Sequence, residues 1–348
     1  MPKNYQASAA AIRSAYGQRL RNSDYRDLLN FHSVPEIVQY LKDTPRYGEL
    51  LYSLEPMYTH RGHLEMLLER NLFDRCVHFC AMEQLLRKPF FKFFVYEYEI
   101  RELCKAAMLG NQEYISAMST WLTPYASFNV DALARAKDDA EMVKAVSHTP
   151  YAPILQKYLV SARTGTSLAE CEIALRAAAF KRVMADAEKT LKGSDLDAFR
   201  GLVGEQIDLI NIINAYRLLS VFHADHDTLS AMLLPEGGKM PKRVCSELYS
   251  AKNADEFLSV LSTTRYGKKL GGFAVINDIP DNVRLEHAFQ TLRYQTARKA
   301  LHFSGHAAVS LYAVHFLDQI EVRNLITIIE GIRYEKPVSY MQSLMITE

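Results

Sequence analysis

The 348-residue sequence lacks most features that mark a secreted scaffold or a membrane protein. Its five cysteines are an odd number without framework spacing, which is typical of reduced thiols in a cytoplasm. The longest mostly apolar run, residues 307–317, is too short for a membrane helix, which needs about 20 residues. The N-terminus has no apolar signal core, so we expect a cytoplasmic chain with no membrane span of its own.

Sequence signals for nucleotides and nucleic acids are also missing. The 41 basic and 40 acidic residues leave a net charge of +1, without the concentrated basic face that nucleic-acid binding requires. No GxxxxGK[ST], GxGxxG or HExxH motif occurs, and Gly237-Gly238-Lys239 lacks the spacing of a phosphate loop. The sequence therefore predicts no catalytic residue, no cofactor and no nucleic-acid partner.

Candidate metal ligands are incomplete. Two histidine pairs could each share a helix face, His60 with His63 and His223 with His226. Two histidines rarely hold a metal without a third ligand, so we expect none at either pair. Asp138, Asp139 and Glu141 faintly resemble a magnesium motif, but acids are favoured at a helix N-terminus for electrostatic reasons alone.

What the sequence does contain is a threefold repeat. The block from Leu28 to Leu50 aligns without a gap with blocks that start at Leu133 and at Leu248. The blocks share an early glutamate, at Glu36, Glu141 and Glu256, and a threonine, at Thr44, Thr149 and Thr264. Their apolar spacing predicts a helix that ends at the threonine. The threonine would cap a second helix, with Pro45 and Pro150 at its first position.

Helical periodicity dominates the rest of the chain, and residues 271–278 form the one short candidate strand. Each repeat ends in a similar helix, whose acids coincide at Glu99, Asp208 and Glu321. Three residues later, two copies have Asn211 and Asn324, whereas the first copy has Glu102. We expect these acids to be structural rather than ligand-binding, with Arg101, Arg217, Arg323 or Arg333 as possible partners. The predicted helical units are 16–128, 129–236 and 237–348.

The last of these helices, QIEVRNLITIIEGIRY from Gln319 to Tyr334, resembles the C-terminal signature of the C subunit of the V/A-type rotary ATPases. The eukaryotic counterpart is called the d subunit. The helix from Ile207 to Arg217 is similar to that family's matching segment. So are the threonine corners, each with a tyrosine close behind, at Tyr47, Tyr151 and Tyr266. The first closing helix departs from the pattern, because it has Glu102 and no match to Arg217.

The resemblance implies an all-α funnel of three similar bundles around a pseudo-threefold axis. Such a chain would sit on the cytoplasmic side of the membrane rotor ring, bind the D and F subunits of the central stalk, and carry torque for proton or sodium transport without chemistry of its own. Charges near the corners are then possible stalk contacts at the rim, although ordinary solvated surface also explains them: Arg46, Arg265, Lys268 and Lys269. Two other classes stay open, a helical-repeat scaffold of another assembly and an all-α enzyme built from scattered carboxylates.

Overall fold

The computed structural model describes residues 6–82, 84–109, 119–161, 167–234, 238–270 and 281–347. These residues form helices and turns without any β-strand, which confirms the all-α class. The candidate strand at 271–278 lies outside the described residues. The chain divides into two compact units, Met1–Phe91 with Gln290–Glu348, and Lys92–Phe289.

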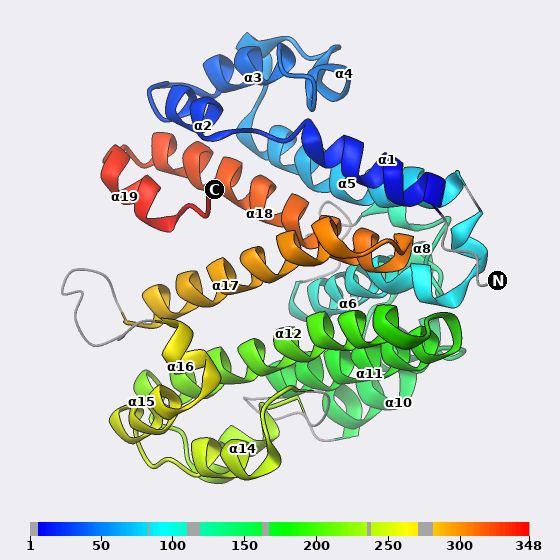
Figure 1. Ribbon diagram of the computed structural model, residues 1–348. Helices are drawn as coiled ribbons and strands as arrows, with labels where there is room; N and C mark the ends of the chain where they lie inside the picture. The colour runs from blue at the N-terminus through cyan, green and yellow to red at the C-terminus, as the bar shows by residue number, and fades with distance from the viewer. Residues whose placement is uncertain are drawn as a thin grey trace. The chain divides into compact units, whose positions relative to one another are not determined.

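The first unit combines the two ends of the chain (Figure 1). Its N-terminal part contains α1 (Gln6–Gly17), α2 (Asn22–Leu28), α3 (Val34–Lys42), α4 (Gly48–Leu51) and α5 (Arg61–Ala81). Short 3-10 turns lie between α4 and α5, at Pro56–Tyr58, and after α5, at Leu85–Arg87. Its C-terminal part contains the end of α17 (Asp281–Phe303), α18 (Ala307–Arg333) and α19 (Val338–Leu344). The long α18 contacts both α1 and α5, so helices from opposite chain ends build this unit.

The second unit holds the middle of the chain. Its long helices are α6 (Phe93–Met108), α11 (Ser167–Thr190), α12 (Gly193–Ser220) and the start of α17. Its shorter helices are α8 (Val130–Arg135), α9 (Asp139–Ala145), α10 (Ala152–Leu155), α13 (His226–Ala231), α14 (Lys242–Tyr249), α15 (Ala254–Thr263) and α16 (Arg265–Leu270). A 3-10 turn at Thr120–Leu122 and a π-helical segment at Gln156–Ser161 complete it.

The first corner, formed by α3, α4 and the turn between them, packs on two long helices. Ile37, Val38 and Leu41 are fully buried, as their helical spacing predicts. Their cluster includes leucines of α5, at Leu64, Leu68 and Leu72, and apolar residues of α18, at Val322, Leu325, Ile328 and Ile329. The corner therefore packs on the middle helix of its own repeat and on the closing helix of the last repeat.

The other corners also pack on the closing helix of the repeat before them. Met142 and Val146 of the second corner share a core cluster with its own middle helix α11 and with α6, the closing helix of the repeat before it. At the third corner, the Phe257 ring lies 6.2 Å from the Tyr216 ring of α12, the closing helix of the second repeat. Each corner is thus joined to the closing helix that precedes it in cyclic order. The sequence repeat did not predict this pairing.

Candidate functional site at three helix corners

The glutamate shared by the three blocks is part of a helix cap. Its backbone N–H donates to the side chain at the N-cap position, which is Ser33, Asp138 or Asn253. Its carboxylate in return accepts the backbone N–H of the residue before that cap, at 2.7–2.9 Å for His32, Lys137 and Lys252. This reciprocal pair is a variant of the capping box, because in the standard box the acid accepts the N–H of the N-cap residue itself. Asp138 and Glu141 therefore serve the start of α9.

The threonine at each corner connects two helices. Its hydroxyl donates to the carbonyl three residues earlier, at 2.7 Å for Leu41 and Val146 and 2.6 Å for Leu261. The same oxygen accepts the N–H of the next tyrosine at 3.2–3.3 Å, that of Tyr47, Tyr151 or Tyr266. A helix begins directly after Thr264 as predicted, but α4 and α10 begin only at Gly48 and Ala152. Pro45 and Pro150 therefore lie in a turn that this bond closes, not at the first helical position.

The tyrosines that follow these threonines bind the closing-helix acids. The Tyr47 hydroxyl donates to Glu321 at 2.7 Å, the Tyr151 hydroxyl to Glu99 at 2.6 Å, and the Tyr266 hydroxyl to Asp208 at 2.7 Å. All six side chains are buried. The acids coincide in the repeat alignment and so do Tyr151 and Tyr266, whereas Tyr47 stands one position later than they do. Each pair nevertheless joins a corner to the preceding closing helix. We call each pair, named by its acid, a clamp.

Each clamp also holds the backbone that leads into its corner. Glu321 accepts the N–H of Leu20 at 2.9 Å, just before α2, and Glu99 accepts that of Ser127, just before α8. Asp208 accepts the N–H groups of Lys239 and Met240, at 2.7 and 3.0 Å, just before α14. A buried carboxylate needs several donors to offset its lost hydration. Tyrosine hydroxyl and backbone N–H supply them in all three clamps.

The residue three positions after each acid fixes a second stretch of backbone. Asn211 donates to the carbonyl of Leu234 and accepts its N–H, at 3.0 and 2.7 Å. Asn324 binds Ile346 in the same two ways, at 2.7 and 3.0 Å. Glu102 stands at this position in the first copy and accepts the N–H and the hydroxyl of Ser119. Glu102 therefore anchors the backbone at Ser119 as the asparagines anchor theirs, although it only accepts hydrogen bonds there.

The Glu321 clamp is distinguished by its ion pairs with arginine. Arg46 lies 2.5 Å from Glu321 and 2.7 Å from Asp318, and Arg75 lies 3.0 Å from Asp318. Burial raises the pKa of Glu321, and Arg46 offsets only part of that shift. Burial would also raise the pKa of Asp318, but the Arg46 and Arg75 charges outweigh it and hold the pKa below its usual value. The contact between the two chain ends is therefore a buried network of ion pairs. The sequence analysis did not identify two of its members, Asp318 and Arg75.

The Asp208 clamp depends on a close approach by Gly238. A Cβ atom at Gly238 would overlap the Oδ1 atom of Asp208, which three hydrogen bonds to Oδ2 keep in place. Burial raises the pKa of Asp208, and the bonds from Tyr266, Lys239 and Met240 oppose that shift. Gly238 and Lys239, which are not a phosphate loop in sequence, thus belong to the joint between the second and third repeats.

Comparisons with known proteins give the family of the chain. The profile of the ATP synthase (C/AC39) subunit family matches residues 8–344. The chain belongs to this family. It is 24% identical over 285 residues to the C subunit of the A-type ATP synthase of Methanosarcina mazei, which covers 77% of this chain and 72% of that protein. The same-named protein of Methanocaldococcus jannaschii is 24% identical over 338 residues, covering 92% and 81%. That of Methanosphaera stadtmanae is 19% identical over 262 residues, covering 74% and 65%.

The C/AC39 family is that of a structural subunit of the rotary ATPase, not of its catalytic subunits. This confirms the predicted family and the prediction that the chain has no enzyme activity of its own. Within the described residues, no three His, Cys, Asp or Glu side chains gather closely enough to hold a metal ion. His60, half of one candidate pair, instead accepts the Gly62 N–H and caps α5. Across the same described residues, no helix is long and apolar enough to cross a bilayer.

The predicted rim charges of this C/AC39 chain separate into two groups. Arg265, Lys268 and Lys269 are exposed on α16, beside the third corner. Arg46, by contrast, is only 7% exposed and pairs with Asp318 and Glu321, so its prediction as a rim charge is wrong. The ungapped repeat already aligns Arg46 with Tyr151 and Tyr266. All three of these side chains reach the acid of a clamp.

Three of the four arginines expected beside the closing-helix acids contact other groups. Arg217 forms an exposed ion pair with Glu286 at 3.2 Å. Arg101 lies over the Tyr98 ring and Arg333 over the Tyr334 ring, at 5.2 and 5.0 Å from the ring centroids. The acids instead bind the tyrosines of the next corner in cyclic order. A surface arginine would have to lose its hydration to reach these buried acids, whereas the tyrosines are already buried.

Proposed function

We propose that this chain is the rotor-coupling subunit of an A- or V-type ATPase or ATP synthase. It would link the D and F subunits of the central stalk to the membrane rotor ring, on the cytoplasmic side, and carry torque for proton or sodium transport. Membership of the C/AC39 family supports this role, since the curated relatives are named as subunits of the A-type ATP synthase.

The observation that carries the proposal is the Glu321 clamp. It joins the last closing helix to the first corner in the way that the Glu99 and Asp208 clamps join the later corners. A chain whose last repeat connects back to its first suits a closed arrangement of three repeats, at 16–128, 129–236 and 237–348, around a pseudo-threefold axis. We propose that these repeats form a funnel whose wide end receives the stalk.

Torque transfer requires that the repeats do not slide on one another. Each clamp places a carboxylate, a phenol and backbone N–H groups in a buried setting, where breaking any bond leaves an unsatisfied polar group. The corners would therefore move with their closing helices as one stiff body. This stiffness is a mechanical property that needs no bound cofactor.

Arg265, Lys268 and Lys269 are the proposed stalk contacts. They stand on the short helix that carries Tyr266, so a stalk that binds them would load the Asp208 clamp directly. Exposed charges of this kind govern association rate and salt sensitivity more than final affinity. The proposal thus predicts a salt-dependent effect of changing them.

The test is a charge reversal, Lys268→Glu with Lys269→Glu, assayed for binding to the D–F stalk and separately to the ring. We expect slower, more salt-sensitive stalk binding and an unchanged ring interaction. Lys242→Glu with Arg243→Glu on the exposed face of α14 is the matched control. Equal stalk binding by wild type and both variants at low salt would reject these contacts, whereas failure of the wild type to bind either partner would favour a scaffold of another assembly.

A further inference from the structure

Two segments of the first unit carry basic residues and no acid. Residues 6–23 contain Arg13, Arg19 and Arg21, and residues 290–317 contain Arg293, Arg298 and Lys299. The whole chain balances 41 basic against 40 acidic residues, so these segments depart from its composition. The first segment includes α1, the second includes the end of α17, and the two face each other across a groove.

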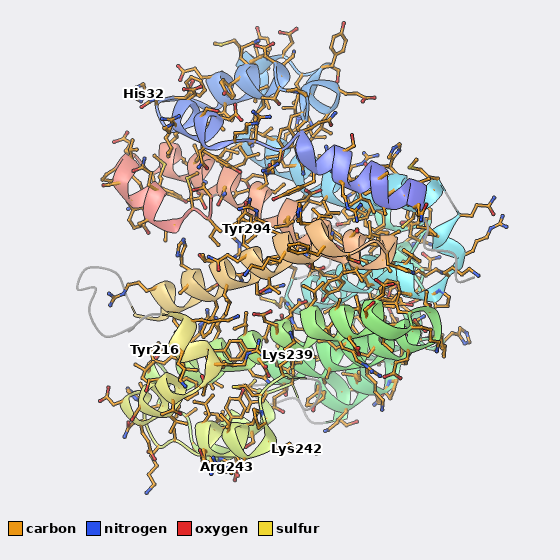
Figure 2. All side chains as sticks on the ribbon, in the orientation of Figure 1. His32, Tyr216, Lys239, Lys242, Arg243 and Tyr294 are labelled. Carbon is orange, nitrogen blue, oxygen red and sulfur yellow. The ribbon has the colours of Figure 1, made fainter. Side chains whose placement is uncertain are left out.

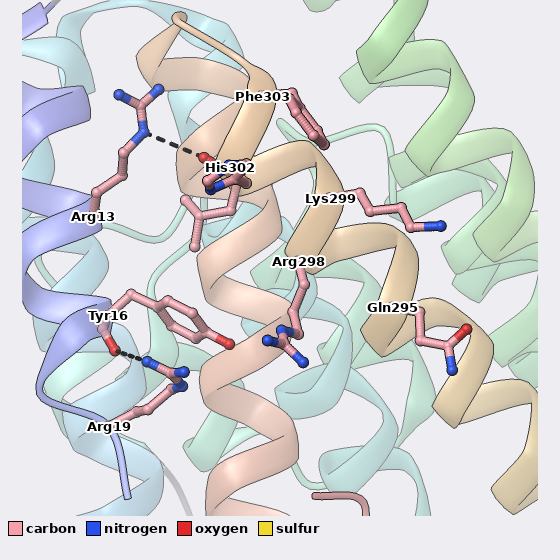
Figure 3. A pocket seen from close by; sticks show the side chains of 9 residues that line it. Arg13, Tyr16, Arg19, Gln295, Arg298, Lys299, His302 and Phe303 are labelled. Carbon is pink, nitrogen blue, oxygen red and sulfur yellow. Dashed lines mark hydrogen bonds between the residues drawn. The ribbon is translucent and has the colours of Figure 1, made fainter. Parts of the chain in front are cut away.

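The groove has a volume of about 500 Å³, within the range of small-ligand pockets of roughly 300–1,000 Å³. Arg13, Arg19, Arg298 and Lys299 line it, together with aromatic side chains such as Tyr16 and Phe303 (Figure 3). None of the described residues in its lining is acidic. Four positive charges around one concave surface create a potential that favours anions.

The cations come from three places: Arg13 from α1, Arg19 from the turn that follows α1, and Arg298 and Lys299 from α17, where Figure 3 shows Lys299 directed away from Arg298. Arg298 and Lys299 lie on the face of α17 that also presents Gln295 and His302, because these positions are spaced as one helical face. Figure 3 shows the Arg298 side chain directed toward Tyr16 and Arg19. The Arg19 guanidinium lies 4.4 Å from the Tyr16 ring centroid, so the ring supports this cation at the edge of the groove.

Arg13 has a separate role in building the groove. Its Nε atom donates to the carbonyl of Leu301 at 3.2 Å, and its Nη2 atom donates to the carbonyl of Ser304. These carbonyls end α17, where the helix dipole is negative. Arg13 therefore joins α1 to α17 and offsets the negative end of that helix dipole.

We propose that this groove binds a phosphate-bearing anion with two or more negative charges, held by Arg19 and Arg298, with the Lys299 charge adding to the positive potential of the groove. Guanidinium groups match phosphate oxygens in pairs, and lysine adds a compact charge. Phe303 is 79% exposed at the rim, so an apolar surface adjoins the phosphate position. Two sources share this chemistry, a soluble diphosphate and the headgroup of an anionic lipid.

The test uses the full-length chain and two probes. Inorganic pyrophosphate is titrated calorimetrically, and vesicles of phosphatidylglycerol with phosphatidylcholine are assayed by co-sedimentation, both at low salt. The groove variant is Arg298→Gln with Lys299→Gln, two exposed positions. The matched control is Lys242→Gln with Arg243→Gln, an adjacent exposed pair on α14 (Figure 2). Circular dichroism checks the fold, and single Lys299→Gln serves if the double variant unfolds.

We expect wild type and control to bind within about twofold of each other, and the groove variant to bind at least tenfold more weakly, or about 1.4 kcal/mol. Single Lys299→Gln should weaken binding about threefold. Pyrophosphate binding with this pattern identifies a soluble source, and vesicle binding alone with this pattern identifies a lipid headgroup. No wild-type binding to either probe, or an equal loss in the control, would overturn the proposal. The isolated chain suffices, so the result is independent of the rotor role.

Discussion

Replacing Tyr151 by phenylalanine removes one hydroxyl from the Glu99 clamp and leaves the ring in place. Glu99 is fully buried and accepts hydrogen bonds from the Tyr151 hydroxyl, at 2.6 Å, and from the Ser127 N–H. Hydrogen bonds to a charged group contribute about 1.5–3 kcal/mol, and losing one leaves the carboxylate poorly satisfied. We therefore expect Tyr151→Phe to lower the free energy of unfolding by about 2 kcal/mol.

The matched control is Tyr96→Phe, in the same compact unit. The Tyr96 hydroxyl is buried and has no hydrogen-bond partner among the described residues. Its removal also leaves the ring beneath the Arg182 guanidinium, which lies 4.1 Å from the centroid. An unpaired buried hydroxyl is unfavourable, so Tyr96→Phe should change stability by less than about 0.5 kcal/mol or increase it.

The chain contains a suitable probe for this comparison. Its single tryptophan is Trp121, whose ring lies 5.0 Å from the Tyr98 ring in the same unit. Urea unfolding followed by tryptophan fluorescence therefore reports on the unit that contains the Glu99 clamp. A lower midpoint for Tyr151→Phe alone, with an unchanged slope, is the expected result. Equal midpoints for Tyr151→Phe and wild type, or equal losses in both variants, would refute the clamp.

Three further changes test the corners by urea unfolding. Thr264→Ala should cost about 1 kcal/mol, because the hydroxyl accepts the N–H groups of Tyr266 and Gly267; a neutral result contradicts the cap. Gly238→Ala should destabilise by at least 1 kcal/mol or so, because its Cβ meets the fixed Asp208 carboxylate, whereas Gly17→Ala, with open space around it, should not. Asp208→Asn tests the raised pKa of Asp208. The Asp208 carboxyl group stays protonated to higher pH in the folded chain than in the unfolded chain. The stability that this difference contributes is present below about pH 4, the pKa of the unfolded group, and is lost as the pH rises through the folded pKa. The variant lacks this loss, so its stability relative to wild type should increase from about pH 4 to about pH 7; a flat difference contradicts the shift.

Local patterns predicted the helices well. Ile37, Val38 and Leu41 follow helical spacing and are buried, and the apolar segment from Ala307 becomes the buried α18. Such periodicity depends on neighbours one turn apart, which a sequence displays directly. The shared glutamates could also have been identified as helix-cap residues, since Ser33, Asp138 and Asn253 stand three positions before them.

The tyrosine partners of the closing-helix acids could not be found in this way. Glu321 and Tyr47 lie 274 residues apart, and nothing in helical spacing says which of three equivalent corners an acid joins. Arginines nearby in sequence were the local alternative, whereas the tyrosines that bind the acids come from a different repeat. The burial of Arg46 could have been suspected from the sequence, because the repeat aligns it with Tyr151 and Tyr266, and both of these tyrosines are buried.

Coupling itself is tested most directly by omitting this chain from a reconstituted rotary ATPase. ATP hydrolysis and ion transport are measured on the same vesicles, with and without the purified chain added back. The account predicts that the complex lacking the chain still hydrolyses ATP but does not drive ion transport, and that adding the chain restores transport. Full ion transport without the chain, or ATP hydrolysis by the isolated chain, would contradict a non-catalytic coupling role.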